Sequence, residues 1–265
     1  MSSNAAPAAR GTFAPNPGSA ALPRQVLAQA RMETRLLLRN GEQLLLAIVI
    51  PLIVLVGGIL AADRIHLHVT GSAVDTLTPG ILALAVMSTS FTSLAIATGF
   101  ERRYGVLKRL GASPLPRSGL LAGKVCALLF VEVLQAIVIC VVAAALGWSP
   151  ALSPVAVVGA LLTAVLGTAA FASLGLLVAG ALRAEATLAA ANLIYLLLLA
   201  AGAVVLPSTS YGAFGHVARL LPSGALGDAM RTACLDAQVG WRDLLVLLVW
   251  GAAGTWLTAR TFRWE

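Results

Sequence analysis

The chain has 265 residues, of which 59% are hydrophobic and only 11% are charged. An ordinary globular domain is about 45 to 50% apolar and about 25% charged, so the composition indicates an integral membrane protein and excludes a soluble domain. The net charge of +7 does not indicate a nucleic acid partner, because such surfaces need clustered basic and aromatic residues on a soluble fold.

Residues 1–20 consist largely of Ala, Pro, Ser, Gly and Asn. Such a composition cannot bury enough apolar surface to become ordered, so we predict a disordered tail. The segment lacks the short apolar core of a cleavable signal peptide, and we therefore expect no processing. Residues 21–265 are predicted to form one transmembrane domain.

A different pattern follows in residues 21–41, where apolar side chains recur at helical spacing with four arginines between them. The apolar residues are Val26, Leu27, Met32, Leu36 and Leu37, and the basic ones are Arg24, Arg31, Arg35 and Arg39. The pattern predicts an amphipathic helix with a basic face, suited to lying in the membrane interface. A cytoplasmic extension of the first membrane span is an equally good interpretation of the same residues.

Six apolar segments are long enough, or nearly so, to cross a hydrocarbon core, which takes roughly 20 helical residues. We therefore expect an all-α integral membrane fold with six transmembrane helices. The expected spans lie near residues 44–62, 79–100, 125–146, 155–182, 187–206 and 244–259.

The distribution of Lys and Arg predicts the orientation of these spans. With both termini inside, fourteen of the 18 basic residues lie on the cytoplasmic side, and only Arg64, Arg219, Arg231 and Arg242 lie outside. Because cytoplasmic loops carry the excess of basic residues, an N-in and C-in topology is expected.

The loop between the second and third spans, residues 100–124, holds six of the 18 basic residues. It contains Glu101-Arg102-Arg103-Tyr104-Gly105, then Leu107, Lys108 and Leu110, and further on Pro114, Pro116, Arg117 and Gly123-Lys124. This pattern is similar to the loop that joins the second and third spans of ABC-2 type transporter permeases. The resemblance implies that Glu101 to Leu110 form a cytoplasmic coupling helix that contacts an ATP-binding subunit, and it favours an interfacial helix at residues 21–41.

A single helix over this loop would place Glu101, Tyr104 and Lys108 on one face, since they are spaced i, i+3 and i+7. Leu107 and Leu110 would add apolar contacts with the partner. Many relatives carry an acid where this chain has Arg103, so the charge of the contact is expected to differ here. The alternative is a solvated basic loop that only fixes the topology.

The segment at residues 207–243 is too long for a simple turn and too polar to span the membrane. Its Leu221-Pro222 pair followed by Asp228 and Arg231 resembles the stretch that precedes the last span of ABC-2 permeases. The resemblance implies an outer re-entrant segment in which Pro222, Asp228 and Arg231 belong to a lid over the pathway.

Two pairs of polar residues lie inside expected spans: Glu132 with Gln135, and Asn192 with Tyr195. Each pair is spaced by one helical turn and shares a face. Polar side chains at this depth either line a translocation path or form a site for a cationic amphiphile, or they join neighbouring helices by hydrogen bonds. For Glu132, the hydroxyl-rich second span from Ser88 to Ser93 offers such partners, and both interpretations stay open.

Several motifs of other functions are missing. Gly119-x-x-x-Gly123-Lys124 has one residue too few between its glycines, and lacks the following Ser or Thr, to be a phosphate-binding loop. We therefore predict no cofactor and no catalytic residue in this chain. An integral membrane enzyme or a haem-handling membrane protein is the alternative, but His66, His68 and His216 all lie in expected outer loops, so no metal site is predicted.

The resemblance implies the membrane subunit of an ABC-2 exporter of the cell membrane, similar to the permeases of daunorubicin resistance and of other antibiotic or lipid efflux systems. ATP and Mg²⁺ would bind to two copies of a separate ATP-binding subunit. Six spans make half of a pathway, so a second permease, identical or related, is also expected. The chemical identity of the substrate cannot be predicted from the sequence.

Overall fold

The computed structural model describes residues 20–65, 72–111 and 115–261. Most of the predicted tail, His66, His68 and Pro114 therefore lie outside the described residues. Every regular element within those ranges is a helix. In chain order they are α1 (Leu22–Arg39), α2 (Gly41–Ile65), α3 (Ala73–Met87), the π-helix η1 (Ser88–Ser93), α4 (Leu94–Arg103), α5 (Val106–Gly111), α6 (Arg117–Ala145), α7 (Pro154–Ala181), α8 (Ala184–Ala201), the 3₁₀-helix η2 (Ser208–Phe214), α9 (Gly215–Ala218), α10 (Pro222–Asp236) and α11 (Trp241–Thr261).

Five helices within the described ranges are long and apolar enough to cross a membrane. They are Ala73–Arg103, which runs through α3, η1 and α4, and then Ser118–Ala145, Pro154–Ala181, Ala184–Ala201 and Trp241–Thr261. The segment expected to form the first span lies in α2, whose shorter apolar part covers Ala47–Ala62.

Some helices do not begin or end where the expected spans do. The helix of the second span begins at Ala73, before residue 79. Helix α6 begins at Arg117, before residue 125, and its first turns are held by α1 and carry a basic residue, Lys124, that is buried and paired. Helix α8 ends at Ala201, before residue 206, because the chain leaves the helix at Gly202 and Ala203 adopts a positive φ of 55°.

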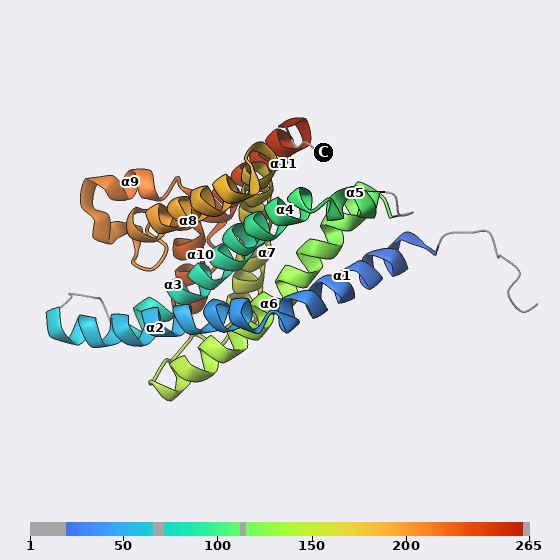
Figure 1. Ribbon diagram of the computed structural model, residues 1–265. Helices are drawn as coiled ribbons and strands as arrows, with labels where there is room; N and C mark the ends of the chain where they lie inside the picture. The colour runs from blue at the N-terminus through green and yellow to red at the C-terminus, as the bar shows by residue number, and fades with distance from the viewer. Residues whose placement is uncertain (1–19, 66–71, 112–114, 262–265) are drawn as a thin grey trace, which may run out of the picture.

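Helix α1 is separate from α2 and packs along the first half of α6 (Figure 1). Gly123 makes this contact close, since a Cβ there would lie 2.6 Å from Cγ of Gln29. Gln29, Ala30 and Glu33 are buried, while the four arginines of α1 stay exposed. The helix is therefore no straight extension of the first span.

The centre of the bundle is formed by α3, α7, α10 and α11. Helix α10 lies inside the bundle: a Cβ at Gly167, in the middle of α7, would touch Leu226, and most of α10 is buried. Figure 1 shows α1 and α5 at one end of the molecule and α9 at the other. We call these two ends the α5 end and the α10 end.

The membrane-length helix Ala73–Arg103 contains a π-helical turn, η1, at Ser88–Ser93. π-helical turns often occur at functional sites. Gly175 allows α7 to lie close to this turn, because a Cβ at residue 175 would lie 2.8 Å from the carbonyl oxygen of Phe91 in η1. The hydroxyl-bearing residues of η1 are thereby held at a fixed place in the bundle.

Candidate functional site

The predicted coupling segment is an elbow of two helices, which we define as residues 101–111. Helix α4 ends at Arg103, Tyr104 and Gly105 form a turn, and α5 begins at Val106. Gly105 has a φ of 68°, a left-handed conformation that side chains with a Cβ adopt only at a cost. The prediction that one helix places Glu101, Tyr104 and Lys108 on one face is therefore wrong, since the turn changes the direction of the chain.

Glu101 points into the protein. The Nζ atom of Lys124 lies 2.7 Å from Glu101 Oε1 and 3.0 Å from Glu33 Oε1, and the lysine side chain is only 4% exposed. Gln29 donates a further hydrogen bond of 2.8 Å to Glu33. This cluster, Glu33, Glu101 and Lys124, joins the end of α4 to α1 and α6.

The two arginines that follow reach other helices. Arg102 donates to the carbonyl oxygen of Gly180 over 2.7 Å and also to that of Leu182. These carbonyls belong to the end of α7, where unpaired acceptors and the helix dipole favour a cation. Arg103 forms an ion pair with Glu185 in the first turn of α8. Three consecutive side chains thus connect the end of α4 to four other helices.

Beyond these contacts, the elbow presents an exposed surface. The Tyr104 side chain is 65% exposed and stacks on Phe100, and Lys108 and Arg109 of α5 are exposed as well. Leu107 is buried, at 3% exposure. The expectation that Leu107 supplies an apolar contact to a partner is therefore wrong, because it packs within the chain.

Asn192 and Tyr195 line a cavity of about 610 Å³, which we call the α2–α8 cavity. It lies between α2, the η1 region and α8, and its polar wall includes Ser88, Thr92 and Ser93. The hydroxyl oxygen of Thr92 is buried without a hydrogen-bond partner among the described residues. The structure thus brings the predicted polar pair of the fifth span together with the hydroxyls of the second.

Glu132 and Gln135, which were expected to share a helix face, form hydrogen bonds with different neighbours. Gln135 is fully buried: it accepts from Thr89 at 2.9 Å and donates to the carbonyl of Ala47 at 2.9 Å. The predicted bond to the second span is therefore made by Gln135. Glu132 accepts from Thr168 of α7 at 2.6 Å and lines a second cavity of about 750 Å³, the α6–α7 cavity.

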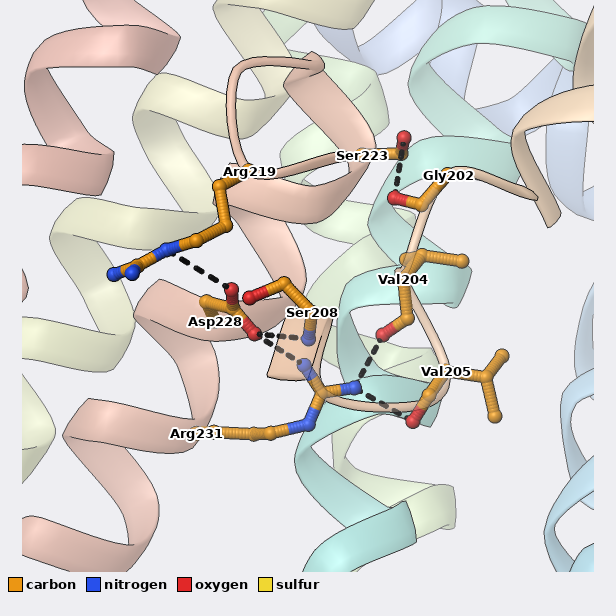
Figure 2. A network of polar contacts seen from close by, with 8 residues as sticks. All are labelled: Gly202, Val204, Val205, Ser208, Arg219, Ser223, Asp228 and Arg231. Carbon is orange, nitrogen blue, oxygen red and sulfur yellow. Dashed lines mark hydrogen bonds and ion pairs between the residues drawn. The ribbon is translucent and has the colours of Figure 1, made fainter. Parts of the chain in front are cut away.

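The residues predicted to form a lid make a polar network around Arg231 (Figure 2). Its guanidinium donates to Asp228 at 3.0 Å and to the carbonyls of Val204 and Val205 at 2.7 and 2.6 Å. Burial lowers the pKa of Arg231 to about 10, against the opposing effect of Asp228. The guanidinium thus stays charged at neutral pH and satisfies irregular backbone that would otherwise have no partner.

Three further contacts belong to this network (Figure 2). Asp228 accepts from the backbone N–H of Ser208 at 3.3 Å and lies 3.9 Å from Nε of Arg219, and Ser223 donates to the carbonyl of Gly202 at 2.9 Å. Pro222 is the first residue of α10 and is buried. Asp228, Arg231 and Ser223 therefore hold α10 against the segment that follows α8.

Residue patterns did not predict that Lys124, Glu33 and Glu185 contribute to the site. A lysine inside an apolar helix is costly unless it is paired, so the position of Lys124 was a usable signal. Its partner in α1 was not, because helical periodicity does not tell which helix a face contacts. Within the described part of the chain, no group of three or more His, Cys, Asp or Glu side chains is arranged to hold a metal ion.

The chain is similar to one known protein family. The model of the family described as ABC-2 family transporter protein matches residues 64–260. These residues include the elbow, the α6–α7 cavity, the network around Arg231 and the part of the α2–α8 cavity that η1, α4 and α8 line. The part of that cavity lined by α2 lies outside the matched residues. No curated protein matches the chain.

Proposed function

Because the chain belongs to the ABC-2 transporter family, we propose that it is the membrane-spanning permease subunit of an ATP-driven exporter. It moves a hydrophobic or amphipathic substrate, such as a drug, an antibiotic or a lipid-like molecule, out of the cytoplasm or the inner leaflet. A separate subunit, present in two copies, binds ATP and Mg²⁺. A second permease, identical or related, completes the pathway.

The observation that carries this proposal is the elbow. Its inward contacts use the partly buried Glu101 and Arg102 and the exposed Arg103 to hold α1, α6, α7 and α8, while its other side exposes Tyr104, Lys108 and Arg109. A force applied to the exposed side would reach all of these helices, because each is tied to the end of α4. A loop that only fixed the topology would need none of these contacts.

The distribution of charge supports placing the α5 end in the cytoplasm. The basic residues of α1, the elbow, Arg183 and Arg260 all belong to this end, whereas Arg219, Arg231 and Arg242 belong to the other. The positive-inside rule then gives an N-in and C-in topology with six spans, the first formed by α2. In this orientation α10 is a re-entrant helix that enters the bundle from outside, and Pro222, Asp228 and Arg231 act as its lid.

The α2–α8 cavity is the proposed translocation path. Asn192 and Tyr195 face three hydroxyl side chains across it, so polar parts of a substrate find hydrogen-bond partners at membrane depth. Large apolar side chains of α2 and α8, such as Ile53, Leu193 and Leu197, are more than half exposed beside it. They form the face on which the second permease would close the path.

The proposal is tested by separating the exposed side of the elbow from its buried side. The full chain is co-expressed with its ATP-binding subunit, and the double variant Lys108→Glu, Arg109→Glu is compared with Arg242→Glu, an exposed change at the α10 end. We expect the first to release the ATPase during purification or to uncouple its activity from transport, and the second to behave like the wild type. Normal retention and normal transport in the double variant would show that the elbow is only an anchor.

A further inference from the structure

A residue that lines the α6–α7 cavity carries a buried carboxylate oxygen without a partner. Glu132 is 6% exposed, and while its Oε2 accepts from Thr168, its Oε1 has no hydrogen-bond partner among the described residues. A charged or polar group left unpaired in an apolar interior is costly. The lining of the cavity therefore includes an unsatisfied acceptor.

The walls around this acceptor are apolar. They are formed by residues of α3, α6, α7 and α10, among them Val86, Ala136, Ala160, Ala164 and Met230. Glu132 is the one charged residue among the described residues that line the cavity. A volume of about 750 Å³ falls within the range of pockets that take drug-sized molecules.

The position of Glu132 along its membrane-length helix limits which kinds of ligand can occupy the α6–α7 cavity. It lies in the middle of the 28-residue candidate span Ser118–Ala145, and its partner Thr168 lies in the middle of the 28-residue span Pro154–Ala181. A phospholipid keeps its headgroup at the membrane surface, so its charge would not reach this level. A lipophilic cation, whose charge sits within an apolar body, matches both the carboxylate and the walls.

We propose that the α6–α7 cavity is a binding site for monovalent lipophilic cations, with Glu132 as the residue that pairs with the charge. The site is separate from the α2–α8 cavity, which is lined by different helices. The inference deepens the proposed function by giving its substrate a chemical class, and it rests on that function only for the use of the site. The binding itself needs no partner subunit.

The test is equilibrium dialysis of radiolabelled tetraphenylphosphonium against the full chain in nanodiscs of zwitterionic lipid, with empty nanodiscs subtracted. We expect saturable binding in the wild-type chain. Unlabelled methyltriphenylphosphonium should displace the probe at least about tenfold better than triphenylphosphine oxide, which has the same three phenyl groups and no net charge, since the charge contact is lost in a dry site. Equal displacement by the two compounds would overturn the proposal without any variant.

Three variants test whether the cation binds at Glu132. Glu132→Gln should weaken binding by about tenfold or more, because it removes the charge and keeps the shape, whereas Glu132→Asp should retain part of the affinity. Leu245→Ala, an exposed change on α11 outside both cavities, should bind as the wild type does. Wild-type affinity in a folded Glu132→Gln chain, or loss of binding in Leu245→Ala, would overturn the assignment.

The results also separate this inference from the proposed function. A complex that couples ATP hydrolysis to transport but binds no cation would contradict the proposed cation site and still support the permease function. A chain that binds the cation but works with no ATPase would support the cation site and contradict the permease function.

Discussion

Single side chains fix the geometry of both ends of this molecule. At the α5 end, Lys124 neutralises two carboxylates from different helices, Glu33 and Glu101. At the α10 end, Arg231 satisfies one carboxylate and two backbone carbonyls. In both places the removal of one cation leaves several buried acceptors without a partner, and this predicts large effects from single substitutions.

The first prediction concerns Lys124. Replacing it with Met should destabilise the protein by about 3–5 kcal/mol, since it leaves two partly buried carboxylates close together. Adding Glu33→Gln and Glu101→Gln should restore most of that loss, because the charges that need Lys124 are then gone. Thermal unfolding in detergent, with exposed Lys108→Met as control, measures both effects. A triple variant less stable than Lys124→Met alone would contradict this explanation.

A second prediction concerns Arg231. Arg231→Leu should lower the free energy of unfolding by about 3–5 kcal/mol, since the mostly buried Asp228 then keeps only the longer ion pair of 3.9 Å with Arg219 and the carbonyls of Val204 and Val205 lose their donor. Arg242, which is exposed, provides the matched control, and Arg242→Leu should change stability little. The same thermal assay applies, and equal stability of the two variants would show that the network around Arg231 is dispensable.

The resemblance to ABC-2 permeases, and not charge or periodicity alone, pointed to Glu101, Arg102, Asp228 and Arg231. The structure shows that all four make polar contacts within the chain. Residue patterns did not predict that Glu101 points inward, since a helical period gives the angle between side chains and not the helix that each one meets. The left-handed turn at Gly105 changed the angle as well, and glycine permits such a turn without requiring it.

At the scale of helices, small residues determine how closely the elements pack. Gly123 lets α1 lie against α6, and Gly167 does the same for α10 against α7. The helical content and the approximate positions of the spans followed from long apolar runs. The docking of α1 and the insertion of α10 did not, because several helices offer small residues and the sequence does not pair them.

The third prediction tests the contact between α1 and α6. Gly123→Leu should cost about 1–3 kcal/mol of packing, because the new side chain overlaps Gln29. We expect trypsin to cut α1 after Arg31 or Arg35 faster in this variant than in the wild type. Gly57→Leu in α2, where a Cβ would meet nothing within 4 Å, is the control. Equal cleavage rates in all three proteins would mean that α1 does not depend on this contact.

At the scale of the whole molecule, the two ends differ in charge, and that difference predicts its orientation. The fourth prediction uses single cysteines at exposed positions in a chain without its three native cysteines. Ser118→Cys at the α5 end should react with a membrane-impermeant maleimide only after the cells are permeabilised, whereas Ala213→Cys at the α10 end should react in intact cells. Ala213 is preferred to its neighbour Gly212, whose φ of 56° disfavours a side chain. The reverse labelling pattern would contradict the topology.

In the proposed function, this chain transmits the work of a separate ATPase and hydrolyses no ATP itself. The most direct measurement is the ATPase rate of the purified full chain, alone and in complex with its ATP-binding subunit, in the same proteoliposomes. We predict no hydrolysis above background for the chain alone, and hydrolysis by the complex that the double variant Lys108→Glu, Arg109→Glu alters or abolishes. Appreciable hydrolysis by the isolated chain would contradict the account.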